Sequence, residues 1–220
     1  MKYLFFLILL YCGSLKGKAQ ESLTLFFEPE VEFNYNITSK YSHSFGIENR
    51  NYIYRMDDFQ YQVKHLEFAH TSTYALNETQ ALSLGLQYRF EEHFIASEEN
   101  EFRLLQAFEW ASSSSQLNLK QELQTELRFF KSTTKYRLRY ELGLKFPLSK
   151  TNNYIITETE SLFEIAKTQK PELEQRLSLM HGWSFNPKTS LEIGLQYRLA
   201  DYIQNSEHEL FLVCSYEIDL

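Results

Sequence analysis

The chain has 220 residues, 16% aromatic side chains, seven glycines and four prolines, which excludes collagen-like, disordered and disulfide-scaffold proteins. Its formal net charge of −7 argues against nucleic acid as a partner, because nucleic-acid binding requires a basic face. A mean hydropathy of −0.41 is typical of a β-barrel, in which half of each strand is polar. One continuous set of alternating segments predicts a single domain.

The N-terminus has the three regions of a secretory signal peptide. Lys2 is basic, Leu4–Tyr11 is apolar but too short for a membrane-spanning helix, and Gly17-Lys18-Ala19 places small residues at positions −3 and −1. We therefore expect residues 1–19 to be cleaved off before Gln20, which leaves residues 20–220 as the barrel domain. Cys214 is then the only cysteine left, so an intrachain disulfide is excluded.

Alternation begins at Leu23–Ile37, where odd positions are mostly apolar and even positions carry acids and asparagines. Pro29 removes one ladder donor from this segment, and we expect a bulge there. Further along, the apolar phase changes from odd to even, which predicts a bulge near Lys64-His65. Turns are predicted at residues 38–40, 77–79 and 186–189, and the pattern is interrupted at residues 49–51 and 56–58.

The clearest segment is Lys135–Phe146, whose even positions are all apolar or aromatic and whose odd positions are all charged or glycine. It is about as long as the roughly 9–11 residues that a tilted strand needs to cross a bilayer. About eleven such segments are visible along the chain. Since single-chain bacterial barrels have even strand numbers, we predict about twelve antiparallel strands, or ten, with one element of the first sixty residues misread.

Alternation fits two architectures, because a soluble sandwich or lipocalin turns its apolar face inward whereas a membrane barrel turns it outward to lipid. Segment length, the rarity of Gly-rich hairpins and aromatic residues near segment ends favour the transmembrane up-and-down β-barrel. The longer links should then face outward and the short turns the periplasm, with the C-terminus periplasmic. The aromatic residues expected at the interfaces are Tyr88, Phe90, Phe129, Tyr136, Phe146, Trp183 and Phe185.

The polar face of each strand should line the barrel interior, the lumen. Arg137 and Arg139 are expected to pair with Glu122 and Glu126 on one side and with Glu158 and Glu160 on the other. Because the charges are mixed, we expect a structural ionic ladder that fills the lumen rather than a selectivity filter. The predicted lumen-lining residues are Glu122, Glu126, Arg128, Arg137, Arg139, Glu141, Glu158, Glu160 and Arg198.

Three stretches resemble a bacterial barrel family called domain of unknown function 2490. They are R-L-R-Y-E-L-G-L-K-F-P-L at Arg137–Leu148, E-I-G-L-Q-Y-R-L-A-D-Y at Glu192–Tyr202 and H-E-L-F-L at His208–Leu212. The resemblance covers the C-terminal half clearly and implies an outer-membrane barrel. The family brings no catalytic residues. The expected partners are outer-membrane lipid, lipopolysaccharide and the barrel-assembly machinery, and the sequence leaves the oligomeric state open.

We find no phosphate loop, no paired-Cys spacing and no zincin motif, so no cofactor or metal is expected. The alternative to a structural barrel or narrow passive pore is a lipid hydrolase, such as a lipase or lipid A deacylase, with His70 as base and Ser72 as nucleophile. His70 and Ser72 share the apolar face of one strand. No Asn-Gly follows the serine, however, and its expected position is nearer the periplasmic end. A non-catalytic barrel is therefore preferred.

Overall fold

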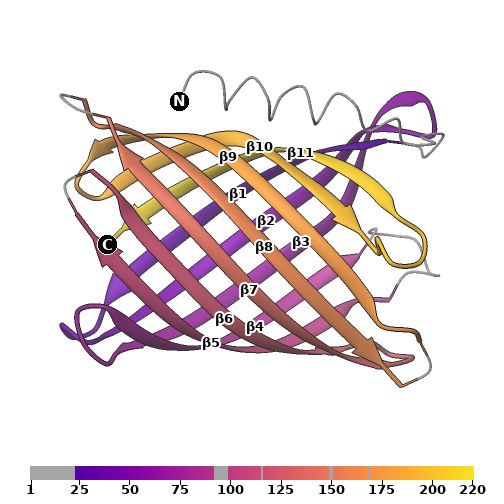
Figure 1. Ribbon diagram of the computed structural model, residues 1–220, viewed down its shortest axis with the longest axis horizontal. Helices are drawn as coiled ribbons and strands as arrows, with labels where there is room; N and C mark the ends of the chain where they lie inside the picture. The colour runs from indigo at the N-terminus through magenta and orange to yellow at the C-terminus, as the bar shows by residue number, and fades with distance from the viewer. Residues whose placement is uncertain (1–22, 92–98, 115, 149–150, 168) are drawn as a thin grey trace, which may run out of the picture.

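The computed structural model describes residues 23–91, 99–114, 116–148, 151–167 and 169–220, and the predicted signal peptide lies outside this range. The described residues form one closed all-β barrel (Figure 1), which confirms the predicted fold class. Its eleven strands within that range are β1 (Thr24–Asn36), β2 (Tyr41–Arg55), β3 (Asp58–Ala75), β4 (Gln80–Glu91), β5 (Glu101–Ser113), β6 (Asn118–Phe129), β7 (Thr134–Pro147), β8 (Asn153–Ala166), β9 (Glu172–Asn186), β10 (Thr189–Ala200) and β11 (Glu207–Asp219).

The barrel closes through a parallel pair. Every consecutive pair of strands is antiparallel, but β1 and β11 run in the same direction, with Leu25 opposite Leu210 and Asn34 opposite Asp219. Parallel closure allows an odd number of strands, and the described chain has eleven, which is close to the predicted number of about twelve. The expectation of a misread element among the first sixty residues is therefore wrong.

The interruptions in the N-terminal pattern have local explanations. Met56 and Asp57 have φ values of 53° and 62°, as the central residues of a two-residue type I′ hairpin require. Residues 49–51 continue β2 without a break. The predicted bulge at Lys64 is confirmed, because Arg50 pairs with His65 and the next residue, Asn51, pairs with Val63.

The predicted bulge at Pro29 is wrong. The register between β1 and β2 is the same on both sides of Pro29, and it shifts instead between Leu25 and Phe26. Pro29 lies opposite Cys214 at the parallel pair. The barrel accommodates the missing donor without an extra residue.

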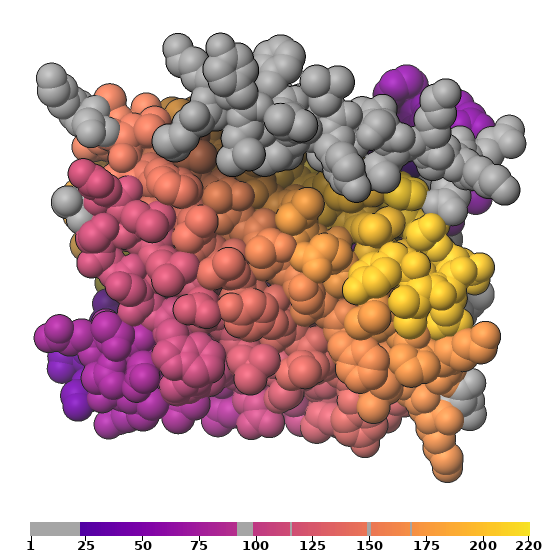
Figure 2. Space-filling model, viewed as in Figure 1, coloured from indigo at the N-terminus to yellow at the C-terminus, as the bar shows by residue number. Residues whose placement is uncertain are grey.

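The outer face of the barrel is apolar and exposed. Leu179, Leu195 and Leu212 lie next to one another on β9, β10 and β11, with exposed fractions of 61%, 53% and 40%. On the face shown in Figure 2, the side chains of neighbouring strands form a continuous wall. Of the aromatic residues predicted near the rims, all but Trp183 are among the exposed large side chains. Within the described range, no helix has the length and hydropathy of a membrane-spanning helix.

Two rims bound the barrel. The N-rim is the end where β1 begins at Thr24, and it carries the links at residues 56–57, 92–100, 130–133, 167–171 and 201–206. The C-rim is the end where β11 finishes at Asp219, and it carries the links at residues 37–40, 76–79, 114–117, 148–152 and 187–188. The links expected to face outward thus share one rim, and the short turns share the other.

Candidate functional site: the charged lumen

A cavity of about 530 Å³ occupies the lumen and is lined by residues of all eleven described strands. Strand alternation explains its chemistry, because the residues that alternate with the outer apolar positions all point inward. The lining is therefore mostly charged. Its arginines are Arg50, Arg89, Arg103, Arg128, Arg137, Arg139, Arg176 and Arg198, and its glutamates are Glu28, Glu30, Glu48, Glu67, Glu158, Glu160, Glu174, Glu192 and Glu209.

Two buried glutamates organise one side of this lining. Glu101 accepts from Arg103 Nε at 2.9 Å and from Arg128 Nη2 at 2.9 Å, with only 1% of its side chain exposed. Glu164 accepts from Arg137 Nη2 and from Lys135 Nζ, both at 2.7 Å, and also from Arg128. Arg128 therefore links two carboxylates on strands that are not neighbours, and the pairs form one network.

The remaining arginines extend this network around the lumen. Arg89 donates to Glu67 at 2.7 Å, and Arg176 donates to Glu174 at 2.6 Å. At the parallel pair, Glu28 accepts from Arg198 Nη2 at 2.9 Å and also from Arg50. Buried charges are costly unless they are paired and hydrogen-bonded, and these arginines meet that condition.

An apolar cluster supports the network at the parallel pair. Phe26 stacks on Phe211 with ring centroids 4.6 Å apart, and Tyr52 packs against Phe26 at 4.9 Å. The Arg198 guanidinium lies 3.7 Å from the centre of the Phe211 ring, where a cation is attracted by the ring face. Side chains from β1, β2, β10 and β11 therefore pack together inside the lumen and join the first strand to the last.

In the half of the lumen near the C-rim, lysine and tyrosine side chains rather than arginines contact the carboxylates. Lys120 Nζ lies 3.5–3.7 Å from carboxylate oxygens of Glu109, Glu122 and Glu141. Tyr154 donates to Glu192 at 2.8 Å, and Lys145 Nζ lies 3.6 Å from the centre of its ring. The tyrosine ring lies over Gly182, where an added Cβ would come within 2.0 Å of it, so only glycine fits there.

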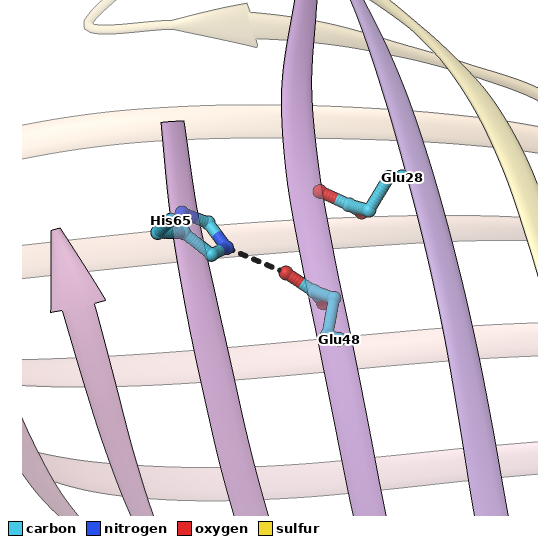
Figure 3. Close-up of side chains that lie close together, drawn as sticks. All are labelled: Glu28, Glu48 and His65. Atoms are coloured by element: carbon cyan, nitrogen blue, oxygen red, sulfur yellow. Dashed lines mark hydrogen bonds and ion pairs between the residues drawn. The ribbon is translucent and has the colours of Figure 1, made fainter. Parts of the chain in front are cut away.

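One cluster has the residue types of a metal site. Glu28, Glu48 and His65 offer ligand atoms that all lie within 4.8 Å of one another (Figure 3), and His65 Nε2 lies 2.7 Å from Glu48 Oε1. Arg50 contacts both carboxylates, and Arg198 binds Glu28. These guanidinium groups already supply the positive charge that an ion would bring. The cluster therefore fits a metal poorly and belongs to the ion-pair network.

The structure places the predicted lumen residues in two groups. Of the four predicted partners of Arg137 and Arg139, Glu126 lies 3.9 Å from Arg137 and Glu160 lies 3.4 Å from Arg139. Glu122 and Glu141 instead approach Lys120, and no ion pair is seen for Glu158 within the described residues. Six of the predicted residues line the cavity: Arg128, Arg137, Arg139, Glu158, Glu160 and Arg198.

Much of the network lies outside the predicted set of lumen-lining residues. Each member left out of that set nevertheless lies on the polar face of its strand, namely Arg89, Arg103, Arg176, Glu101 and Glu164. The same alternation rule that selected Arg137 would have found them. Glu28 lies on the regular polar face of β1, whereas Arg50 carries a weaker signal, because the pattern is interrupted at residues 49–51 of β2.

His70 and Ser72 both lie on the outer face of β3, as expected, but their hydrogen bonding differs from the predicted pair. Ser72 Oγ lies 2.9 Å from Nδ1 of His43 on β2, and His70 Nε2 lies 3.1 Å from the same nitrogen. The base nearest Ser72 is therefore His43, which the sequence analysis did not consider. Its partnership depends on the register of β2 against β3, where His43 lies opposite Ser72.

Comparison with protein families matches residues 29–209 to a family described as "Protein of unknown function (DUF2490)". This range runs from β1 into β11, so it takes in nearly the whole described barrel. No curated protein matches the chain.

Proposed function

The chain belongs to the DUF2490 family, and from its barrel we propose that it is an integral β-barrel of a bacterial outer membrane. In this proposal residues 1–19 direct export and are removed, and the apolar wall lies in lipid. The lumen is a charge-filled interior that makes the protein a structural barrel or a narrow passive pore. Its partners are outer-membrane lipid, lipopolysaccharide and the machinery that inserts barrels.

The observation that carries the proposal is the inverted distribution of side chains. A water-soluble barrel buries its leucines and exposes its charges, whereas here Leu195 is 53% exposed and Arg198, on the same strand, is 5% exposed. Large contiguous apolar surfaces are rare on soluble monomers. Membrane barrels have this arrangement, with an apolar band outside and polar residues inside.

The lengths of the links at the two rims support one orientation of the barrel in the membrane. Membrane barrels have short periplasmic turns and longer outer loops, and the two longest links, residues 92–100 and 201–206, are both at the N-rim, although the N-rim also carries the two-residue hairpin at 56–57. In the proposed orientation the C-rim faces the periplasm. Because β1 and β11 are parallel, Thr24 then lies at the outer rim and Asp219 at the inner rim.

The ion-pair network supports a lumen that conducts little. Arg128 connects carboxylates on β5 and β8, so it crosses part of the interior. The remaining cavity of about 530 Å³ is lined by groups of both signs. Such a lining favours neither cations nor anions, unlike a ring of one charge.

The membrane location is tested by fractionation and by gel migration. The full-length protein should be processed before Gln20, co-fractionate with outer membranes, and migrate differently on gels before and after heating. Leu195→Arg distinguishes a water-exposed wall from a lipid-exposed one. An exposed arginine should leave the stability of the fold unchanged in water, but it should lower that stability in lipid. Recovery of the mature chain as a soluble periplasmic protein would contradict the proposal.

The filled lumen is tested by planar-bilayer recording. We expect the unmutated protein to give small or no conductance, and Arg139→Ala to increase it, because Arg139 contacts Glu160 and Gln124 across neighbouring strands. Glu78→Ala, an exposed residue of the link at residues 76–79, serves as a control outside the cavity lining. Large, stable channels in the unmutated protein would instead indicate a general diffusion pore.

A further inference from the structure

Three polar side chains interrupt the apolar outer wall near the C-rim. His43 is on β2, and His70 and Ser72 are on β3. Ser72 Oγ and His70 Nε2 lie 2.9 Å and 3.1 Å from His43 Nδ1, so a hydroxyl and two imidazoles meet at one point. All three side chains are half-buried and reachable from outside. A serine hydroxyl held against an imidazole nitrogen is the usual arrangement of an activated nucleophile.

The histidine at the centre of this group is held by aromatic rings. Tyr41 meets the His43 ring edge-on with centroids 4.7 Å apart, and Tyr35 stacks on it at 5.2 Å. His70 stacks on the same ring at 5.1 Å. The imidazole therefore has little freedom to rotate away from Ser72. A catalytic base needs this kind of fixed geometry.

A groove of about 1020 Å³ begins at these residues and crosses the outer wall. His70 and Ser72 form part of its lining, and most of the rest is apolar. This volume is at the upper end of the range of about 300–1,000 Å³ that is typical of small-molecule sites. The apolar side chains that line it on β4 to β8 include Leu84, Leu86, Leu104, Leu127, Leu138, Phe163 and Ile165. Three residues whose side chains face the lumen, Leu105, Glu126 and Arg137, also contribute to the lining.

We propose that Ser72 and His43 form a catalytic pair that hydrolyses the carboxylic ester of a glycerophospholipid, with the acyl chain in this groove. The proposal rests on the membrane location proposed above. An acyl chain matches the apolar lining, and its ester is the polar group that would reach Ser72. In the proposed orientation the C-rim faces the periplasm, so the substrate lies in the inner leaflet, which consists of glycerophospholipids.

The reaction consists of two acyl transfers. Ser72 Oγ attacks the ester carbonyl while His43 Nδ1 takes the hydroxyl proton, and the C–O bond to glycerol breaks. His43 gives that proton to the departing glycerol oxygen, so lysophospholipid leaves and the acyl group stays on Ser72. Water then attacks the acyl-serine while His43 Nδ1 takes a proton from it, the bond between the acyl carbon and Ser72 Oγ breaks, and His43 returns the proton to Ser72 Oγ as the fatty acid is released. His70 is a positioning residue, because its Nε2 can accept a hydrogen bond from the protonated His43.

The first test measures the nucleophile. The purified barrel in mixed micelles of phosphatidylethanolamine should release fatty acid, and a fluorophosphonate probe should label Ser72. Ser72→Ala should abolish labelling and lower the rate by about 10³-fold or more. Ser161→Ala is the matched control, because Ser161 also lies on the outer face and bonds a side chain of the next strand, Gln175, at 2.7 Å. It should keep full activity.

The second test separates the two histidines. His43→Ala should lower kcat by about 10²–10⁴-fold, as loss of a general base does. His70→Ala should lower kcat by about 10- to 100-fold with KM unchanged, and His70→Gln should recover part of the loss, since its amide oxygen also accepts a hydrogen bond. His208→Gln is the control for an outer-face histidine elsewhere, because His208 contacts Tyr197 and is remote in sequence from β2 and β3.

The catalytic proposal and the membrane proposal fail in different ways. Absence of both hydrolysis and probe labelling in a barrel that is heat-modifiable and floats with lipid vesicles would overturn the catalytic proposal while leaving the membrane proposal intact. Hydrolysis that persists in Ser72→Ala would also overturn it. If Ser72→Ala fails to fold, Ser72→Cys replaces it in a Cys214→Ser background, because Cys214 is a free thiol, and the new thiol should be labelled by a maleimide only when His43 is present. Failure of the unmutated chain to enter membranes would instead remove the premise.

Discussion

The two halves of the lumen follow the same alternation rule but differ in how their charges are held. Near the N-rim, the Arg128 side chain is 9% exposed and binds two buried carboxylates directly. Near the C-rim, the Lys120 side chain is 45% exposed and lies 3.5–3.7 Å from three carboxylates. A guanidinium binds a carboxylate in a fixed two-point geometry, whereas an ammonium is a flexible point charge. One half is therefore a rigid network and the other a solvated acidic region.

The largest expected effect comes from breaking the rigid half. Arg128→Met leaves Glu101 and Glu164 without a shared partner, and truncating one member of a buried ion pair typically costs about 3–5 kcal/mol. We expect the free energy of unfolding in lipid vesicles, measured by urea titration, to fall by this amount. An equally small loss of unfolding free energy in Arg128→Met and Lys120→Met would contradict the difference between the two halves of the lumen.

The second prediction compares an arginine on the outer face of the barrel with the arginines that face the lumen. Leu195 lies at the middle of β10, three residues from the paired Arg198. Leu195→Arg should cost about 2–4 kcal/mol at the centre of a bilayer. The same urea titration measures it, with Leu195→Ala as the control for lost apolar area. An unchanged free energy of unfolding in Leu195→Arg would indicate that this wall faces water.

Removing the lysine of the solvated half should matter little. Lys120→Met should lower the unfolding free energy by less than about 1 kcal/mol, because the Lys120 side chain is half-exposed and its ammonium lies 3.5–3.7 Å from the carboxylates, and solvent-accessible ion pairs contribute about 0–1 kcal/mol and are screened by salt. The effect should shrink further in 1 M salt. A loss as large as that of Arg128→Met would show that the C-rim half is a network as rigid as the other.

The smallest expected effect is at the N-rim, where a hydrogen bond joins Glu99, in the link at residues 92–100, to Ser132, in the link at residues 130–133. Its carboxylate accepts from the backbone N–H of Ser132 at 2.9 Å and from the hydroxyl at 2.8 Å, and these bonds hold the pKa of Glu99 below its ordinary value. The contact should persist above the ordinary carboxyl pKa and be lost as pH falls through the lowered one. In an NMR titration, Ser132→Ala should raise the pKa of Glu99 part of the way back, and Ser114→Ala should not change it.

The sequence by itself determined the strands and their two faces. Lys135–Phe146 predicts β7 to within a residue at each end, and the phase change predicts the Lys64 bulge, because alternation with period two is a local property of each strand. The same property selects which residues point inward. It also marks the turns at residues 38–40 and 77–79, where the alternation stops.

Tertiary structure decided how the strands meet. The alternation shows about eleven segments, but only the parallel pairing of β1 with β11 shows how an odd number of strands closes, because no local pattern contains the direction in which two ends of a sheet join. Register and stagger decided that Glu164 rather than Glu122 binds Arg137, and that His43 rather than His70 lies against Ser72. These partners are 27 and 29 residues apart, and their distance depends on cross-strand register, which alternation leaves undetermined.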